Sequence, residues 1–556
     1  MLRKDYLRDY WMSGKRLCIE TTRVRLKEIV GYMLKQDARL VHVTVADLGI
    51  RGFELAHHYA LDHIQRHLHI MVKVKVPRES SEAVSVAKET WEASWAEREM
   101  AELTGFRFIG HPDPRHLFLP YEWPSTVESG EFDETQVVGR TDMSKEEVRQ
   151  EMGRWVPLAV RPEDAKATLI PIGPYHPLLI EGIYFRIKVR GEEIVDADLK
   201  PGFVHRGIMR LSENRDYWRN IYLFERVCGI CSHTHTTAYC NTVELLGEID
   251  LPDRARYIRT LVAELERIHS HLLWLGVAGH LIGFHTLFML AWRDREHVQD
   301  ILEIISGNRC AYAMNNIGGV RRDVPKEMIP KIEKKLDILE DATKKFIDIV
   351  CDQPVVQARL QGVGVLKTST AKETGAVGPT ARGSNWKIDV RQSDPYAAYG
   401  SEYTSWYVIV ESGGDVWART LVRLKELLVA INICRQCLDA LRAVGGSIQA
   451  EVSEFEAGAE ALGKSEAPRG ELLYYIKSNG TNIPQTVRIR TPSYRNNACL
   501  PYMLKGYEIA DAPIIIGSID PCISCTDRMV IVEDERTGRM ERYTLEQIAR
   551  KYERSM

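Results

Sequence analysis

The sequence predicts an α+β protein, in which a small α+β N-terminal domain is joined to a large, mainly α-helical domain. Three observations lead to this prediction. Residues 40–50 and 67–76 alternate apolar and polar positions as strands do. Residues 126–164 are acidic, polar and short of large apolar side chains, which is typical of a linker. Residues 423–446 place apolar side chains at helical spacing and end in a glycine stop.

The order of these segments gives the expected domain boundaries. We expect the N-terminal domain to cover residues 1–125, with segments 40–50 and 67–76 as paired strands, and the linker to cover 126–164. The second domain is expected over residues 165–528. A few strands should lie near its start, where "YFRIKVRGEEIVDADL" alternates β-type residues. Residues 529–556 form a charged tail with no motif of its own.

The most apolar run, residues 271–292, is about as long as a membrane-spanning helix. It contains His271, His280 and His285, and imidazoles are costly in a bilayer, so a buried core helix is the preferred interpretation. The N-terminus is charged throughout and lacks the apolar core of a signal peptide. We therefore expect a cytoplasmic chain that reaches a membrane only through its partners.

Composition argues against nucleic acid as a partner. Lys and Arg number 74 against 77 Asp and Glu, which gives a formal net charge of -3. A nucleic-acid-binding domain usually carries a concentrated excess of Lys and Arg. With 44% hydrophobic residues, the chain is instead a globular protein large enough for two sizeable cores.

The eleven cysteines carry the chemical signal. In a cytoplasmic chain they are expected as thiols or metal ligands rather than disulfides. Two C-x-x-C pairs, Cys228/Cys231 and Cys522/Cys525, stand beside turn-forming residues, with a glycine inside "CGIC" and a proline in front of "CISC". Turns of this kind let two thiolates converge on one ion.

The other cysteines are interpreted mostly as buried apolar thiols. Cys434 and Cys437 form a third C-x-x-C pair, but they lie within the predicted helix 423–446. The remaining five are scattered: Cys18, Cys240, Cys310, Cys351 and Cys499.

Three kinds of metal site compete for the four outer thiolates. Cys231 and Cys522 are 291 positions apart, whereas a zinc ribbon brings its two pairs together within about 15 to 20 residues. An iron–sulfur cubane usually takes three cysteines from one short run. A catalytic site that joins the two ends of one domain fits better, and thiolates select soft or borderline metals such as nickel and iron. Spacing alone does not name the metal.

At this point the residues resemble a known family. "RVCGIC", with His235 four positions later, and "DPCISCTDR" are similar to the paired metal motifs of [NiFe] hydrogenase large subunits. "EAPRGELLYYIKSNG" and "TPSYRN" resemble two segments that stand between those motifs in the family. The segment 95–124 looks like the 30 kDa subunit of respiratory complex I, and residues from about 165 onward also resemble its 49 kDa subunit. This fusion is similar to group 4 membrane-associated hydrogenases of the formate hydrogenlyase type.

The resemblance implies a bimetallic centre of nickel and iron. All four cysteines would bind nickel, and Cys231 and Cys525 would also bridge to an iron that carries CO and CN ligands. The terminal thiolates of Cys228 and Cys522 would be basic enough to accept a proton, which gives them a catalytic role. The alternative is a cysteine arrangement that has lost its metal.

The resemblance also assigns residues around the metals. Arg469, from the "EAPRG" segment, would stand over the iron as a catalytic residue and hydrogen-bond a cyanide; its alternative is a structural ion pair with Glu466. Pro492 and Ser493 would complete this lining, with the hydroxyl donating to the second cyanide, unless Ser493 is an ordinary turn residue. His235 would hydrogen-bond a thiolate and tune its basicity, or else be a core histidine.

The chain departs from the family at Met209. A glutamate commonly stands there, two residues after "RG", and relays protons from a cysteine, whereas methionine cannot carry a proton. Either another group such as Glu213 or His205 serves as the relay, or the chemistry is slow or altered. His233 is left as a structural residue.

The resemblance implies that the C-terminal tail, residues 529–556, is removed during maturation. A maturation peptidase cuts after the residue that corresponds to Arg528 once nickel is loaded, so we predict cleavage between Arg528 and Met529. The alternative is a C-terminal helix that the mature protein retains.

Partners follow from the same resemblance. We expect a small iron–sulfur hydrogenase subunit, a polyferredoxin-like subunit, antiporter-like membrane subunits, and formate dehydrogenase or ferredoxin as electron donor, with the chain on the inner face of the cytoplasmic membrane. Two other functions stay open. One is a metal-free quinone-site subunit like that of complex I, a class that lacks both C-x-x-C pairs. The other is a bimetallic reductase that acts on a sulfur compound.

Overall fold

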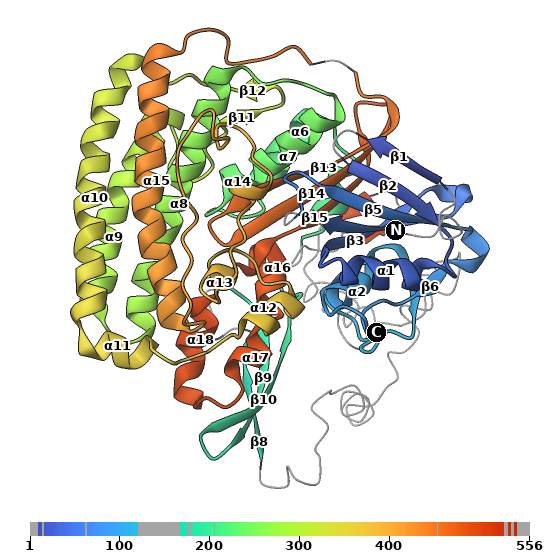
Figure 1. Ribbon diagram of the computed structural model, residues 1–556, viewed down its shortest axis with the longest axis horizontal. Coiled ribbons are helices and arrows are strands. Elements are labelled where there is room, and N and C mark those ends of the chain that lie inside the picture. The colour runs from blue at the N-terminus through green and yellow to red at the C-terminus, as the bar shows by residue number, and fades with distance from the viewer. Residues whose placement is uncertain are drawn as a thin grey trace.

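The computed structural model describes residues 9–13, 16–61, 64–119, 167–174, 176, 181–204, 206–452, 454–526, 532–534 and 539–541. The expected linker, 126–164, lies outside these residues. A strand-rich N-terminal part and a largely helical part with small sheets are both present, which confirms the predicted α+β class. Figure 1 shows the long helices on one side, the N-terminal sheet on the other, and strands β13–β15 between them.

The N-terminal part is built on a five-stranded sheet of order β1-β2-β5-β4-β3. The pair β2 and β5 is parallel and the other neighbours are antiparallel. Its elements are β1 (Asp9–Ser13), β2 (Arg16–Thr21), α1 (Leu26–Lys35), β3 (Arg39–Asp47), β4 (Phe53–Ala60), β5 (His69–Val76), β6 (Glu82–Val84), α2 (Glu92–Thr104) and β7 (Arg107–Ile109). The predicted strands are β3 and β5, but they do not pair with each other, because β4 lies between them.

The two faces of this sheet have different partners. One face packs its apolar residues against α1 and α2. The other face contacts the sheet β13-β14-β15 of the second part through a small apolar cluster that includes Val41, Met71, Leu473 and Tyr475. Ion pairs cross the same interface, among them Lys477 Nζ with Glu54 at 2.6 Å. The N-terminal sheet is therefore packed directly on strands of the second part.

Four long helices form the main core of the second part (Figure 1). They are α8 (Asp253–Leu281), α9 (His285–Ser306), α10 (Ile329–Asp352) and α15 (Val416–Ala443). The helix predicted from residues 423–446 is α15, and its Cys434 and Cys437 are fully buried in this core.

The apolar run 271–292 is two helices rather than one. Helix α8 ends at Leu281 and α9 begins at His285, with Gly283 in the left-handed region at φ +80°. The α8 side is buried as expected, but Met289 and Trp292 on α9 are exposed. In the part of the chain that the structure describes, no helix combines the length and the apolar character needed to cross a membrane.

Smaller elements surround this bundle. The predicted strands near the start of the domain are β9 (Tyr184–Arg190) and β10 (Glu193–Lys200), which pair with β8 (Thr168–Ile172). The sheet β13 (Ala457–Ala467), β14 (Gly470–Asn479) and β15 (Pro484–Arg490) is antiparallel. The other short elements are α5 (Ile208–Ser212), α6 (Tyr217–Glu225), α7 (Ser232–Leu246), β11 (Asn315–Asn316), β12 (Gly319–Val320), α11 (Pro354–Leu360), α12 (Thr368–Thr374), α13 (Gly378–Arg382), α14 (Val390–Ser393), α16 (Pro492–Asn497), α17 (Leu500–Leu504), α18 (Ala512–Ser518), α19 (Ile523–Thr526), β16 (Val532–Asp534) and β17 (Arg539–Glu541).

Candidate metal centre

The first C-x-x-C pair occupies the turn between α6 and α7. The backbone N–H of Ile230 lies 3.3 Å from Cys228 Sγ, and Gly229 at the tip of the turn is exposed. Helix α7 begins directly after Cys231. Two N–H groups of its first turn, on His233 and Thr234, donate to the buried carboxylate of Glu266 on α8. A carboxylate at a helix N-terminus satisfies donors that the helix itself cannot pair, so α8 fixes this turn.

The second pair lies near the C-terminal end of the second part, with Cys522 directly before α19 and Cys525 within that helix. Asp520 turns the chain with a φ of +55°, which an aspartate tolerates better than most residues. The N–H of Cys522 donates to Ser493 Oγ at 3.0 Å, and Thr491 Oγ1 donates to the carbonyl of Cys525 at 3.0 Å. The segment just after β15 therefore holds both cysteines of this turn.

The two turns bring all four thiols together. Cys522 Sγ lies 3.1 Å from Cys525 Sγ and 3.3 Å from Cys228 Sγ, and Cys231 Sγ lies 3.5 Å from Cys525 Sγ. The two cross-turn contacts each span 294 positions in the sequence. All four side chains are buried, at 5% exposure or less, and none forms a disulfide.

The electrostatics of the cluster suit a cation. Hydrogen bonds from the thiols of Cys231 and Cys522 lower the pKa of Cys228 well below its usual value, whereas burial raises the pKa of Cys525. One thiolate is thus stabilised only while its neighbours keep their protons. A bound metal ion removes that conflict, because thiolates are its ligands. Four converging sulfur donors in a buried site fit a thiophilic metal.

His235 lies one turn into α7 and faces the second pair. Its Nε2 is 3.4 Å from Cys525 Sγ, and its Nδ1 is 2.8 Å from the hydroxyl of Tyr474 on β14. A ring held at one nitrogen by a hydroxyl presents the other nitrogen in a fixed direction. His233, on the same helix, instead contacts the carbonyl of Arg259 with its Nε2 and lies away from the thiols, as a structural residue does.

Arg469 occupies the tight turn between β13 and β14. Its guanidinium is held by Asp520, with Nη2 2.8 Å from Oδ1 and Nε donating to the backbone carbonyl at 2.7 Å. Nη1 lies 3.3 Å from Ser270 Oγ. The ion pair with Glu466 that was the alternative for this residue does not form. Asp520, immediately before the second cysteine turn, is the carboxylate that orients Arg469.

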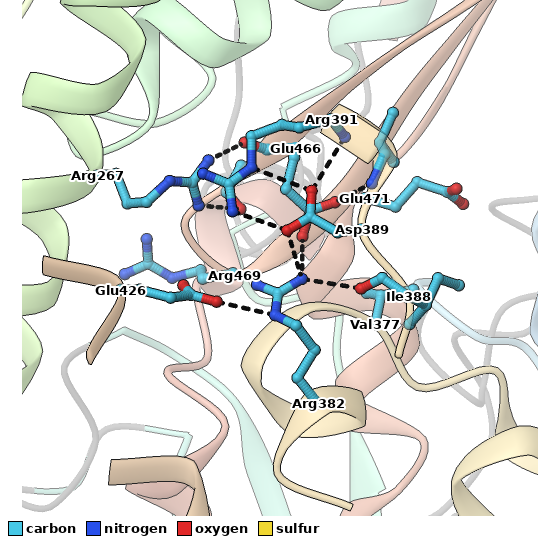
Figure 2. Close-up of polar contacts among 12 residues, drawn as sticks. Arg267, Val377, Arg382, Ile388, Asp389, Arg391, Glu426, Glu466, Arg469 and Glu471 are labelled. Carbon is cyan, nitrogen blue, oxygen red and sulfur yellow. Dashed lines mark hydrogen bonds and ion pairs between the residues drawn. The ribbon is translucent and has the colours of Figure 1, made fainter. Parts of the chain in front are cut away.

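Glu466 has another partner, Arg382, which is fully buried on α13. Arg382 Nη1 lies 2.8 Å from Glu466 and 3.2 Å from Asp389, and its Nε lies 2.8 Å from Glu426 on α15 (Figure 2). The backbone N–H of Val390 also donates to Glu466 at 3.1 Å. This buried network connects the end of β13 to the segments that carry Arg382, Asp389 and Glu426. Arg469 pairs with Asp520 instead.

Comparisons with known proteins agree with this geometry. Residues 206–297 match the family described as nickel-dependent hydrogenase. Residues 19–129 match the 30 Kd subunit of respiratory-chain NADH dehydrogenase, and residues 282–457 and 450–528 match its 49 Kd subunit. Formate hydrogenlyase subunit 5 of Escherichia coli (strain K12) is 36% identical over 489 residues, which cover 86% of this chain and 84% of that protein.

The chain belongs to the group 4 membrane-bound [NiFe] hydrogenase large subunits, with fused complex I 30 kDa and 49 kDa domains. It is thus a nickel-dependent hydrogenase large subunit, an oxidoreductase. The carbon monoxide-induced hydrogenase of Rhodospirillum rubrum is 41% identical over 360 residues, 65% of this chain and 99% of that protein. A solved structure of a membrane-bound sulfane sulfur reductase matches with a TM-score of 0.62 and 31% identity, over 66% of this chain and all of the matched one.

In this large subunit, Met209 is buried on α5, and its sulfur lies 3.3 Å from the N–H of Ile489. Of the two relay candidates, Glu213 is engaged by Arg488, whose Nη1 lies 2.6 Å from its carboxylate. His205 lies outside the described residues. Among the described residues, no contact brings Glu213 to the thiols.

Sequence reasoning missed Glu181, the carboxylate that does reach the second cysteine turn. It accepts hydrogen bonds from the N–H groups of Ile523 and Ser524 and from the Ser524 hydroxyl. Both residues lie between Cys522 and Cys525. The only signal was its place in the segment "LLIEGIYF", which resembles the family but carries no cysteine or histidine.

Pro492 and Ser493 begin α16, beside the second turn. Because Ser493 Oγ accepts a hydrogen bond from the N–H of Cys522, its own hydroxyl hydrogen can be donated to a further acceptor.

The predicted cleavage site, Arg528 and Met529, lies outside the described residues. Of the tail, the structure describes only residues 532–534 and 539–541, which form the short antiparallel pair β16 and β17. Most of the other cysteines are buried as expected, whereas Cys310 is exposed and Cys351 is half-buried.

Proposed function

We propose that this large subunit holds a nickel–iron centre on Cys228, Cys231, Cys522 and Cys525 and reversibly reduces two protons to H2 with two electrons from a partner. The observation that carries the proposal is the convergence of the four buried thiols from turns 294 positions apart. The centre, with CO and CN on its iron, supplies the two-electron chemistry. The chain's own residues supply its ligands, its proton path and its polar lining.

The thiolates divide the work by position. In the proposal, Cys231 and Cys525 would hold both metals, and His235, which lies against Cys525, supports a separate role for that thiolate. Cys228 and Cys522 bind nickel alone, and one of their sulfur atoms accepts the proton. A hydrogen bond from His235 lowers the basicity of the Cys525 thiolate. The proton is therefore directed to Cys228 or Cys522.

The iron side is lined by donors with no mobile proton. Arg469, fixed by Asp520 and Ser270, presents a permanent positive charge in a buried site. The Ser493 hydroxyl adds a neutral donor, and Pro492 adds apolar surface. Donors set in place before the reaction stabilise developing negative charge without reorganisation.

Glu181 takes the role that Met209 cannot fill. Its carboxylate is bound to the backbone inside the Cys522–Cys525 turn, whereas Glu213 is paired with Arg488. In the proposal, a proton passes between Cys522 Sγ and Glu181 and from there toward the surface. General acid–base groups of this kind contribute about 10²–10⁴-fold to a rate.

Electrons come from outside the chain. Among the described residues, the remaining cysteines gather in no further group of metal ligands. We propose a small iron–sulfur subunit, a polyferredoxin-like subunit and antiporter-like membrane subunits as partners, on the inner face of the cytoplasmic membrane. The name of the formate hydrogenlyase relative supports formate dehydrogenase as the donor, with ferredoxin as the alternative. Exposed Gly229 shows that the first cysteine turn reaches the surface, where such a partner can approach.

A second candidate function is reduction of a sulfur compound at the same centre. It is favoured by the likeness to the sulfane sulfur reductase and by Met209 in place of the family glutamate. The deciding experiment assays the anaerobically purified complex with a reduced viologen dye, once with protons and once with polysulfide as the acceptor. H2 evolution supports the hydrogenase function, and polysulfide reduction without H2 replaces it.

Maturation is tested on the same preparation. Once this subunit is separated from its iron–sulfur partners, we expect nickel and iron each near one per chain and an intact mass that ends at Arg528. Zinc, or a metal-free full-length chain in the mature complex, would contradict the nickel–iron centre. A variant changed at Arg528 should keep the tail and lose activity; full activity in a variant that keeps the tail would contradict a required cut.

A further inference from the structure

The N-terminal sheet reaches the turn that carries Arg469. Arg39, the first residue of β3, donates two hydrogen bonds to Glu471 on β14, with Nη1 2.9 Å from Oε1 and Nη2 2.8 Å from Oε2. Glu471 is 1% exposed and stands two residues after Arg469. Paired bonds from a guanidinium to a carboxylate fix distance and orientation together. The position of the Arg469 turn is therefore linked to the N-terminal domain.

Glu471 links this turn to the other lining segment as well. Arg490, the last residue of β15, donates from Nη1 to the Glu471 carbonyl at 2.8 Å and from Nη2 to its carboxylate. Arg490 stands two residues before Pro492. Glu471 thus joins β3 of the N-terminal domain to β14, which begins next to Arg469, and to β15, which ends two residues before Pro492.

A second contact from β3 acts on α16, the helix that carries Ser493. Arg495 on this helix donates to the backbone carbonyls of Leu40 and Val41 at 3.2 and 2.8 Å, and to that of Glu92 at 2.6 Å. The side chain of Glu92 accepts the N–H of Leu40 at 3.0 Å, which holds β3 and α2 together at this point. Residues 39–41 therefore touch both segments that line the iron side.

The Arg469 turn has little room to move independently. A side chain at Gly470 would come within 2.6 Å of the backbone nitrogen of Gly378, and Gly470 has a φ of +127°. Asn496 Nδ2 also lies 3.2 Å from the carbonyl of Arg469. Because protein interiors are close-packed, a shift of Glu471 is passed on to the turn rather than absorbed.

We propose that the N-terminal domain is a positioning element of the metal centre, with Arg39 as its positioning residue: through Glu471 it sets the place of Arg469. The inference rests on the proposed nickel–iron centre, and it gives the fused domain a role inside the catalytic subunit. Loss of Arg39 leaves the buried Glu471 with fewer charge-assisted bonds, which is costly enough to displace the turn.

The test uses the full-length subunit in its purified complex. Arg39→Gln removes the charge, Arg39→Lys keeps it but cannot make both bonds, and Arg25→Gln is the matched control. Arg25 is an exposed arginine of the same domain that pairs with Glu28 at 3.0 Å. Three quantities are measured: nickel per chain, hydrogen exchange of the peptide 467–475, and the electron paramagnetic resonance spectrum of the nickel.

We expect Arg39→Gln to retain nickel, to speed exchange of the 467–475 peptide about tenfold or more, and to shift the nickel spectrum. Arg39→Lys should shift it less, and Arg25→Gln should match the unaltered protein. If Arg39→Gln fails to assemble, Arg39→Lys decides the question by the same two readouts. The proposal would be overturned if an assembled Arg39 variant showed the same hydrogen exchange of the 467–475 peptide and the same nickel spectrum as the unaltered protein. Neither readout depends on which substrate is reduced, so failure of H2 evolution in the unaltered complex would refute the proposed reaction separately.

Discussion

Asp520 and Arg469 form a two-point contact between the second cysteine turn and the β13–β14 turn. Nη2 of the arginine lies 2.8 Å from the Asp520 carboxylate, and Nε donates to the carbonyl of the same residue at 2.7 Å. The planar guanidinium is therefore fixed by side chain and backbone of one neighbour. A flexible ammonium group cannot reproduce that arrangement.

We accordingly predict that Arg469→Lys keeps nickel but lowers H2 evolution about 10²-fold, the usual cost of losing one preorganised donor. Viologen-linked H2 evolution and nickel analysis on the same sample check this. Arg293→Lys is the control, because that arginine is exposed on α9 and pairs with its neighbour Asp294 at 2.7 Å. A lysine variant as active as the unaltered enzyme would show that Arg469 merely supports the fold.

Removal of one thiolate should prevent metal loading. We predict that Cys525→Ser contains no nickel above background and, if cleavage follows loading, keeps residues 529–556. The reason is that Cys525 Sγ contacts both Cys231 and Cys522, so its loss opens the cluster at two points. Metal analysis and intact mass are the measurements. Cys310→Ser changes an exposed cysteine and should behave like the unaltered protein; nickel retained by the Cys525 variant would contradict the ligand assignment.

The proton path is tested by two glutamates. Glu181→Gln should reduce H2 evolution by about 10²-fold or more at unchanged nickel content, because an amide cannot carry the proton. Glu213→Gln should have a much smaller effect, since Glu213 is occupied by Arg488. Steady-state rates in H2O and D2O provide the comparison. The opposite ranking of the two variants would restore Glu213 as the relay.

The N-terminal domain should show a pH-dependent stability. Burial raises the pKa of Glu97 to about 7, against an ordinary value of 4.5, although Ser85 and Val86 donate hydrogen bonds to it. The folded state thus binds a proton that the unfolded chain has released, and stability falls as pH rises from about 4.5 to about 7. The full effect is of order 3 kcal/mol.

Glu97→Gln removes this titration and should therefore raise the unfolding temperature at pH 8 more than at pH 5. Differential scanning calorimetry at the two pH values measures it. Glu28→Gln, on the exposed surface of α1, provides the control and should change neither value. An equal effect of Glu97→Gln at both pH values would mean that Glu97 is not the titrating group.

Local patterns in the sequence were enough for parts of the fold. Strands β9 and β10 and the helix α15 were predicted because their apolar periodicity is strong and local. The break between α8 and α9 was missed, since one glycine inside a long apolar run is a weak signal. The pairing of β3 was wrong because β4, "FELAHHYA", carries two histidines that hide its alternation.

The candidate site shows the same limit. The cysteines could be singled out because thiol pairs beside turns are rare in a sequence. The residues that hold the cysteines in place could not be singled out, because a glutamate or arginine in a sequence does not reveal which distant residue it will contact. Glu181 meets the second turn across more than 340 positions, and Arg39 meets Glu471 across 432. No short-range pattern records contacts of that separation.

The interface between the N-terminal sheet and β13–β15 contains many charges for its small apolar cluster. Lys73 lies between Glu54 and Glu460, and Lys477 also binds Glu54. Interfaces that depend on such pairs gain little net affinity, because desolvation offsets the attraction. If the two domains were separate chains, the fraction of them that is associated would depend on the cellular concentration of each. On one polypeptide the effective concentration of each domain for the other is of millimolar order, so a weak interface can remain closed in every copy of the enzyme whatever its abundance.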